Sequence, residues 1–204
     1  MAKILRSEQK GATKKNILEA ALHEFSRNGY GGTNLRAIAA VAKVNHSLIA
    51  YHYKSKENLW KNAIEFMFSR SREMTSAREG QVSLSGVERF IRDYTYYCAK
   101  FPEHNRIMMQ ASMHDRERLN WVIENLLKKD KDALLGNIIE QKRQGIWPDI
   151  PAVSIIYIVV SACQMVFAVA PEVEMLYDEN VLEDDFIEAH ANAIIKLFFH
   201  HKVK

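Results

Sequence analysis

Residues 45–54 combine side-chain types and spacing suited to hydrogen bonding with a polar, charged surface. If residues 46–53 form a helix that Asn45 caps, one outer face is shared by Asn45, His46, Ser47, Ala50, Tyr51 and Lys54. Amide, imidazole and hydroxyl groups can bond to nucleic-acid bases and phosphates, and the tyrosine ring can contact a thymine methyl group or the backbone. Val44, Ile49 and Tyr53 fall toward a protein core. The segment therefore has one face for contact and one for packing.

This segment is expected to be the second short helix of a helix-turn-helix. Apolar spacing predicts a longer helix over residues 12–28, a short one over 34–42 and another over 46–53. Gly29 can end the first helix because glycine adopts a left-handed backbone at little cost, and Thr33 is expected to cap the second. In such a motif the second short helix fits the major groove of DNA, which is about 12 Å wide. The sequence therefore predicts that residues 46–53 read base edges.

Four more residues are expected to hold phosphates around this helix, supported by helix N-termini. They are Thr33, Arg36, His52 and Lys56. The alternative is that His52 is a packed or solvated ring and Lys54 an ordinary surface charge. Residues 1–60 contain ten Lys/Arg and four Asp/Glu, whereas residues 61–204 contain eighteen and twenty-one. A basic head on a mildly acidic body favours contact with a polyanion, although solvation of the surface alone would also accommodate it.

The whole motif resembles the DNA-binding signature of the TetR family of bacterial transcriptional regulators. The similar stretch runs from Thr33 to Leu59 and reads TNLRAIAAVAKVNHSLIAYHYKSKENL. It follows a first helix that ends in Phe25 and Gly29-Tyr30, and the resemblance in sequence covers residues 10–60. The resemblance implies a homodimer that binds a palindromic operator in double-stranded DNA. It also implies a small-molecule effector, bound in the larger part of each chain.

The motif departs from the family pattern at a few positions. Lys43 stands in the turn where the family usually has glycine, which predicts a slightly strained, left-handed backbone there. Ala50 stands where an aromatic residue is common, Leu48 replaces a more frequent threonine, and Tyr53 replaces phenylalanine. These changes leave the fold intact and bear on which operator sequence is read.

Composition favours long helices throughout the chain. Its 204 residues include only four prolines and eight glycines, and hydrophobic residues make up 48%. Further helices are expected over residues 56–76, 87–101, 105–113, 116–144, 152–170 and 183–200. We therefore expect an all-α fold in two parts. An N-terminal three-helix DNA-binding domain with the helix-turn-helix spans residues 10–60, and a larger α-helical domain for ligand binding and dimerisation spans residues 61–204.

Residues 152–170 contain no charged residue, which makes them a candidate membrane span by length. Gln164, Ser154 and Ser161 are polar, and acidic residues flank the segment, so a helix buried in a dimer is favoured and no membrane partner is expected. The resemblance implies a four-helix bundle made by this helix and the last one of both subunits. The residues expected at the dimer interface are Ile155, Ile158, Val159, Ala162, Met165, Val166, Phe186, Ile187, Ala191, Ile194 and Phe198.

Aromatic and methionine residues are dense in the middle of the chain, where the resemblance implies a small-molecule pocket. Methionine fills irregular space and adapts to ligands of varied shape. The candidate ligand-binding residues are Phe90, Tyr94, Tyr97, Met108, Met109, Met113, Trp121 and Trp147. For each of them an ordinary place in the core is the alternative. We expect an apolar or aromatic effector of unidentified structure.

Other classes of protein are disfavoured by the motifs that the sequence lacks. No nucleophile elbow, phosphate loop, dinucleotide fingerprint or zinc-protease helix occurs, so neither an enzyme nor a cofactor is expected. Cys98 and Cys163 lie far apart, and no histidine spacing indicates a metal site. No apolar run follows the first six residues, so a signal peptide is not expected and the chain should stay in the cytoplasm.

The favoured function is that of a ligand-responsive, DNA-binding transcriptional regulator, and repressors predominate in the family that the chain resembles. An effector that binds only the conformation with misplaced recognition helices would lower DNA affinity by linkage. The helix over residues 56–76 would carry that change. A transcriptional activator and a ligand-independent regulator of the same fold are alternatives, and a membrane-associated helical protein and an enzyme are weaker ones.

Overall fold

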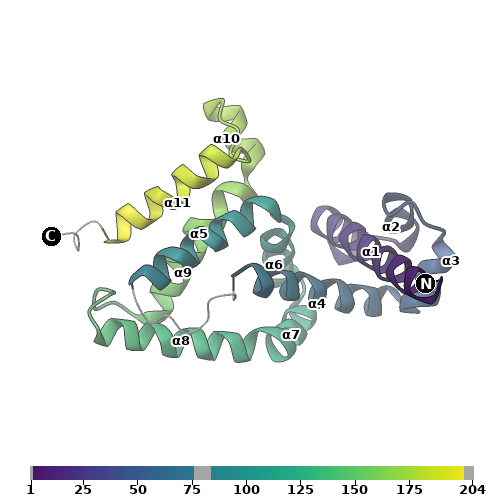
Figure 1. The fold of residues 1–204 in the computed structure, drawn as a ribbon, viewed down its shortest axis with the longest axis horizontal. Helices are drawn as coiled ribbons and strands as arrows, with labels where there is room; N and C mark the ends of the chain where they lie inside the picture. Colours follow the sequence, from purple (N-terminus) through teal and green to yellow (C-terminus); the bar gives the residue numbers. More distant parts are fainter. Residues whose placement is uncertain (1, 76–83, 200–204) are drawn as a thin grey trace. The chain divides into compact units, whose positions relative to one another are not determined.

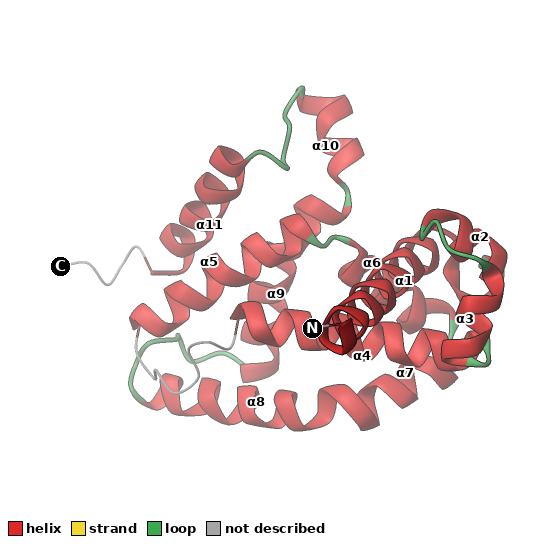
Figure 2. Ribbon diagram, turned by 45° about the vertical axis from the view of Figure 1, so that its right-hand side comes forward, coloured by secondary structure: helices red, strands yellow, loops and turns green. Residues whose placement is uncertain are grey.

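The computed structural model describes residues 2–75 and 84–199, and its regular elements in these ranges are α-helices and one π-helical turn (Figures 1 and 2). The all-α class is therefore confirmed. Contacts divide the chain into two compact units, Met1–Arg70 with Arg106–Arg116 (unit 1) and Ser71–Asn105 with Glu117–Lys204 (unit 2). The expected helix ends at residues 76 and 200 lie outside the described residues.

Helices of both units follow the expected order along the chain. Unit 1 contains α1 (Ala2–Gly32), α2 (Leu35–Val41), α3 (His46–Tyr53) and most of α4 (Lys56–Thr75) and α6 (Glu103–His114). Unit 2 contains α5 (Leu84–Lys100), nearly all of α7 (Arg116–Val122), the π-helical turn (Ile123–Leu127), α8 (Lys128–Arg143), α9 (Ala152–Ala168), α10 (Ala170–Tyr177) and α11 (Asp184–Phe199).

The core of unit 1 joins α1 to α4. Its most buried side chains, each 0–1% exposed, are Ile17, Leu22, Phe25, Ile38, Ile49, Leu59, Ile64 and Met67. They come from all four helices, so each of α1 to α4 presents an apolar side to the others. The backbone oxygen of Ala42, at the end of α2, accepts a hydrogen bond from Asn16 Nδ2 at 2.7 Å. This bond ties the end of α2 to α1 beside the turn that leads into α3.

Unit 1 extends further along the chain than the expected domain of residues 10–60. On α4, Trp60, Ala63 and Met67 are 0–3% exposed, so this helix remains part of the unit 1 core to Arg70. On α6, Gln110 Nε2 donates to the backbone oxygen of Ser26 at 3.0 Å. The expected domain ended near the beginning of α4, at residue 60, whereas unit 1 continues to Arg70. The buried apolar residues of α4 explain this difference, because they pack into the core of unit 1.

Two details at the helix ends correct the sequence prediction. Thr33 does not cap α2, because Asn34 is the N-cap and its side chain accepts from the Ala37 amide at 2.9 Å. The first helix begins at Ala2, ahead of the expected start at residue 12. Gly29 has φ +67°, which kinks α1 at the expected stop, and Lys43 has φ +53°, as its place in the turn predicts.

In unit 2, α5 packs against both α9 and α11, and the two ribbon views show these helices together (Figures 1 and 2). Ile91 from α5, Ile155 and Val159 from α9, and Ile194 from α11 are 0–5% exposed and belong to one apolar cluster. These residues come from segments that are distant in sequence. Burial of each side chain contributes about 1.5–3 kcal/mol to the stability of the folded unit. The cluster is thus the main tertiary support of unit 2.

The region after α9 was predicted wrongly. The sequence predicted no helix between residues 170 and 183, but Pro171 lies in the first turn of a new helix, α10. Proline fits that position because its missing N–H has no helical partner there. The break comes earlier, at Val169, whose φ and ψ of −107° and 24° are not helical. The expected helix over 116–144 is likewise divided by the π-helical turn at Ile123–Leu127.

Among the described helices, none alone has the length and hydropathy to cross a membrane. Within the described part of the chain, α9 and α10 pass the length and composition test only as a pair, and they are bent by 68° at their junction.

Candidate nucleic-acid interface

The outer face of α3 is exposed over its whole length, as the helical spacing predicts. The exposed residues are Asn45, His46, Ser47, Ala50, Tyr51 and Lys54. The Tyr51 side chain is 72% exposed, whereas Ile49 and Tyr53 are only 0% and 7% exposed on the opposite side. Val44 is half-buried. A helix anchored by one fully buried residue and presenting a polar face can enter a DNA groove without loss of its own packing.

Asn45 fixes the start of α3. Its Oδ1 accepts hydrogen bonds from the Ser47 amide at 2.9 Å and from the Ser47 hydroxyl at 3.0 Å. Because this oxygen is engaged in the cap, a contact between Asn45 and a base or phosphate would have to come from its NH₂ group. The cap, confirmed by these bonds, orients the first turn, where recognition helices approach base edges.

The end of α3 is fixed by packing and by an unusual backbone. His52 is half-buried, and its ring lies edge-on between Tyr51 at 5.1 Å and Tyr53 at 6.2 Å. The ring therefore supports the exposed Tyr51. Lys54 has φ +63° and its amide donates to the Ala50 oxygen at 2.9 Å, so the chain turns sharply there and leaves the lysine exposed.

Two of the four residues expected to hold phosphates make internal contacts instead. Thr33 is 2% exposed, with its hydroxyl 2.7 Å from the backbone oxygen of Gly29 and 3.1 Å from that of Glu24. Lys56 Nζ donates at 2.8 Å to the backbone oxygens of both Tyr30 and Thr33 and lies 4.3 Å from the centre of the Tyr30 ring. A buried hydroxyl of this kind is a poor phosphate ligand, and Lys56 joins the start of α4 to the end of α1. Arg36, by contrast, is exposed.

Residues outside the sequence prediction also shape this surface. Tyr53 Oη donates to the backbone oxygen of Lys14 on α1 at 3.5 Å, and burial raises the pKa of Tyr53 so that it stays a neutral donor. Val41, the last residue of α2, is 44% exposed, and Lys43 is exposed in the turn before α3. The left-handed backbone at Lys43 is the one that the sequence indicated where the family usually has glycine.

The comparisons with known proteins agree with this geometry. The family model described as "Bacterial regulatory proteins, tetR family" matches residues 17–63. These residues form a DNA-binding domain of the TetR family. Its members that resemble this chain are helix-turn-helix transcriptional regulators, and this chain is one as well.

The similarity to curated relatives extends beyond the DNA-binding part of the chain. The regulator RutR of Escherichia coli K12 is 25% identical over 185 residues, which is 89% of this chain and 86% of RutR. The probable regulator YttP of Bacillus subtilis is 25% identical over 93% of this chain and 90% of YttP. The repressor NicS of Pseudomonas putida is 27% identical over 114 residues, so the chain spans about half of that protein, 53% of its length.

Solved structures share the fold at low identity. AibR, in a complex with isovaleryl coenzyme A and operator DNA, has a TM-score of 0.71 and 15% identity over 92% of this chain and 98% of that one. A TetR-like transcriptional regulator from Rhodococcus sp. RHA1 has a TM-score of 0.64 and 18% identity, over 91% of this chain and 92% of that one. These likenesses concern the fold.

The aromatic members of the candidate effector site lie in unit 2. Phe90, Tyr94 and Tyr97 stack along α5, with successive ring centroids 5.4 and 6.3 Å apart. The Tyr94 hydroxyl donates to Gln164 Oε1 at 3.1 Å. Burial first, and then the neighbouring thiol of Cys98, raise the pKa of Tyr94 well above its usual value. Tyr94 is thus a neutral buried donor that links α5 to α9.

The remaining candidate effector residues are dispersed. Met108, Met109 and Met113 lie on α6 in unit 1, and Met109 and Met113 are 42% and 69% exposed. Trp121 is half-buried on α7, whereas Trp147 is 5% exposed after α8. The candidate effector residues are therefore divided between the two units.

The expected dimer residues on α9 and α11 divide into two groups. Five of them are 2–5% exposed within their own subunit, namely Ile155, Val159, Ile187, Ala191 and Ile194. They pack in the subunit core, so a partner subunit could not reach them without repacking. Ile158 and Met165 are 47% and 48% exposed, and Ala162, Val166, Phe186 and Phe198 are half-buried.

Exposed apolar residues that the sequence prediction missed lie beside this second group. Val153 and Tyr157 on α9 are 55% and 64% exposed, and Leu197 on α11 is 81% exposed. Because α9 is apolar all round, its sequence pattern could not distinguish the face toward its own core from the face toward solvent.

Proposed function

We propose that this regulator is a repressor that binds a palindromic operator as a homodimer and releases it when a small effector binds. The proposal rests on one observation above all, the exposed polar face of α3 backed by the fully buried Ile49. Direct contact with DNA is assigned to Arg36, Asn45, His46, Ser47, Ala50, Tyr51 and Lys54. His52 supports the Tyr51 ring. Thr33 and Lys56 contribute indirectly, because the Thr33 hydroxyl ties the α1–α2 turn to α1 and the Lys56 ammonium joins α4 to the end of α1.

Homodimerisation is supported by the exposed side of α9 and α11. One helix-turn-helix reads only a few base pairs, and a palindromic site requires two of them related by a two-fold axis. Ile158 and Met165, seven residues apart on α9, together with Tyr157 and Leu197 are exposed apolar side chains that water would otherwise contact. Monomeric proteins seldom leave large apolar patches exposed. We therefore assign the dimer interface to this face of α9 and α11. The five expected interface residues that are buried pack beneath it, in the core of the same chain.

Effector control is assigned to unit 2. The stacked rings of α5 and the Tyr94–Gln164 hydrogen bond give this unit an aromatic, partly polar interior. The α4 helix is continuous from the DNA-binding unit into unit 2, since Lys56–Arg70 belong to the first and Ser71–Thr75 to the second. A ligand that changes the course of α4 would displace α3 from the groove spacing that DNA imposes. We also propose that the chain acts in the cytoplasm and catalyses no reaction.

The decisive experiment is a titration of the full chain with a duplex that carries a palindrome from the region upstream of its own gene. Fluorescence anisotropy at several salt concentrations should give an affinity that falls steeply with salt, because phosphate contacts release counterions. A scrambled duplex of the same composition is the control. Equal affinity for the two duplexes, or no binding at low salt, would overturn the proposal. Increased transcription of the adjacent gene on DNA binding would favour an activator.

A further inference from the structure

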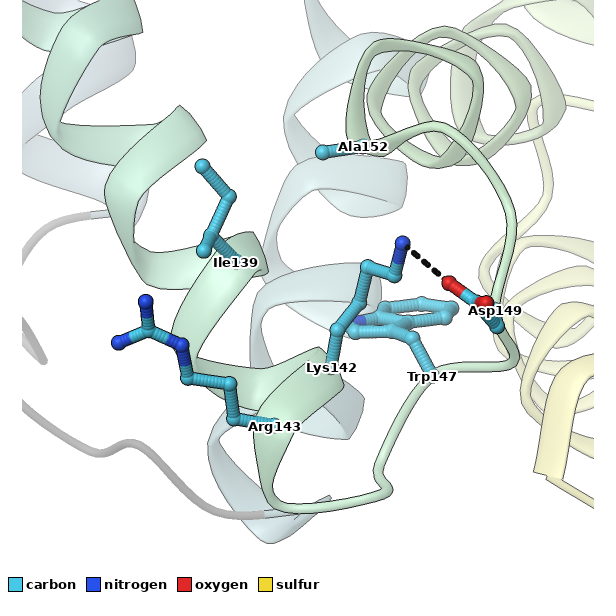
Figure 3. Close-up of a pocket in the computed structure, with 6 residues that line it drawn as sticks. All are labelled: Ile139, Lys142, Arg143, Trp147, Asp149 and Ala152. Carbon is cyan, nitrogen blue, oxygen red and sulfur yellow. Dashed lines mark ion pairs between the residues drawn. The ribbon is translucent and has the colours of Figure 1, made fainter.

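A pocket of about 510 Å³ opens in unit 2 between the end of α8 and the beginning of α9 (Figure 3). Its lining residues are Ile139, Lys142, Arg143, Trp147, Asp149 and Ala152. The volume lies within the range of small-ligand sites, which is roughly 300–1,000 Å³. Except for Trp147, none of these residues belongs to the candidate effector set, so this pocket is a separate place for a ligand.

The lysine of this pocket is held in place, whereas its anionic partner is not. Lys142 Nζ donates to the backbone oxygen of Ile150 at 2.6 Å and lies 3.0 Å from Asp149 Oδ1, as the dashed line in Figure 3 marks. The Lys142 side chain is 23% exposed, but that of Asp149 is fully exposed at 103%. An exposed carboxylate contributes little to such a pair and can be exchanged. Asp149 thus occupies a position that another anion could take.

The surroundings of Lys142 also favour an anion. Arg143, on the same last turn of α8, is 75% exposed, and its Nη1 lies 3.5 Å from Glu140 Oε2. The α9 helix begins at Ala152 behind Pro151, which supplies no side-chain cap, so the positive end of the helix dipole faces the pocket. Asp149 and Glu140 are the carboxylates nearby, and both are exposed and replaceable partners of cations.

The rest of the lining is apolar. Trp147 donates its indole N–H to Gln141 Oε1 at 2.8 Å, in a buried hydrogen bond. With its polar atom already bonded, the indole offers only its apolar ring to a ligand. Ile139, 42% exposed, lines the pocket from α8. A flat apolar body fits such walls better than a second charged group.

We propose that this pocket binds a small organic anion with a flat, apolar body. The anionic group replaces Asp149 as the partner of Lys142, Arg143 adds positive charge to the rim of the pocket, and the body lies against Ile139 and Trp147. The binding itself does not depend on DNA. Its consequence for DNA rests on the function proposed above: the Trp147 ring lies 4.9 Å from Phe199 and 6.1 Å from Phe198, so a ligand against Trp147 acts on α11, a helix of the proposed dimer interface.

Calorimetric titration of the full chain with 1-naphthoate tests the binding, and its neutral amide, 1-naphthamide, is the control ligand. Loss of the charge should weaken binding about tenfold or more, since hydrogen bonds to charged groups are the stronger ones. Asp149→Asn should strengthen naphthoate binding about 3- to 10-fold, because it removes the competing carboxylate. Lys142→Gln and Arg143→Gln should weaken it, and Lys128→Gln, at an exposed pair on the same helix, should leave it unchanged.

The sign of the Asp149→Asn effect decides the proposal. Affinity that is unchanged or lower in this variant, or equal affinity for naphthoate and naphthamide, would overturn it, even if Lys142→Gln fails to fold. The regulatory consequence is measured separately, by anisotropy of the operator duplex with saturating naphthoate. Release of DNA supports the link through α11. Retained DNA with intact naphthoate binding contradicts only that link, and absence of DNA binding without any ligand contradicts only the proposed function.

Discussion

Replacement of Tyr51 by alanine should weaken operator binding with almost no effect on folding. The side chain is 72% exposed, and its ring contact in the free protein is with His52 at 5.1 Å. Little apolar area is therefore lost from the folded chain, and the free energy of unfolding should change by less than about 0.5 kcal/mol. A base-edge or methyl contact in the major groove contributes about 1–3 kcal/mol, which corresponds to a loss of affinity of about 5- to 150-fold.

The chain offers a matched control for this experiment. Tyr177, on α10, is 69% exposed, so Tyr177→Ala removes the same side chain at similar exposure but away from α3. Anisotropy titrations at one fixed salt concentration compare the two variants with the parent chain, and thermal unfolding verifies that all are folded. The salt dependence should be unchanged in Tyr51→Ala, because the ring carries no charge. Equal affinity of the two variants would refute the placement of α3 in the groove.

Three further perturbations follow from the structure. Lys56→Met removes two charge-assisted hydrogen bonds and should lower the free energy of unfolding by about 2 kcal/mol. Lys15→Met, whose side chain is 65% exposed in its ion pair, should change the free energy of unfolding by less than about 0.5 kcal/mol. Urea unfolding measures both changes. Joint replacement of Ile158 and Met165 by aspartate should give monomers in equilibrium sedimentation, and a dimer of parental stability would place the interface elsewhere. Burial raises the pKa of Cys163 from 9.0 to about 11, so ionisation of this thiol favours the unfolded chain. The free energy of unfolding should be at its full value below pH 9 and fall toward pH 11, and it should fall less steeply in Cys163→Ala. A urea midpoint that does not change with pH would contradict this.

Local patterns predicted the recognition helix well because its physics is local. The bounds of α3, the cap at Asn45 and the inward side of Ile49 follow from helical spacing and capping chemistry alone. The role of Thr33 does not, since it depends on a backbone oxygen nine residues earlier at Glu24. To tell a phosphate ligand from an internal hydrogen-bond donor at Thr33, one must know where the end of α1 lies in space. A short stretch of sequence does not give that information.

The larger unit was harder to predict because its helices are apolar on more than one side. Periodicity identified α9 as buried but not which of Ile155 and Ile158 faces the core, although they are 2% and 47% exposed. In unit 1 the sequence likewise did not indicate that Met113, on α6, is 69% exposed. Such assignments depend on which helix packs beside which, and that is set by contacts between distant parts of the chain.

The contacts of Lys56 have a consequence for how an effector signal could reach DNA. Lys56 is the first residue of α4, and its ammonium binds the backbone oxygens of Tyr30 and Thr33 at the other end of the motif. Leu59 and Trp60, 0% and 3% exposed, continue this attachment into the core. Bending α4 locally would break two charge-assisted hydrogen bonds and expose both side chains. Displacement of α1–α3 together with the start of α4, as one body, breaks none of these contacts. A signal carried by α4 should therefore change the spacing between the two recognition helices of a dimer and leave each motif internally unchanged.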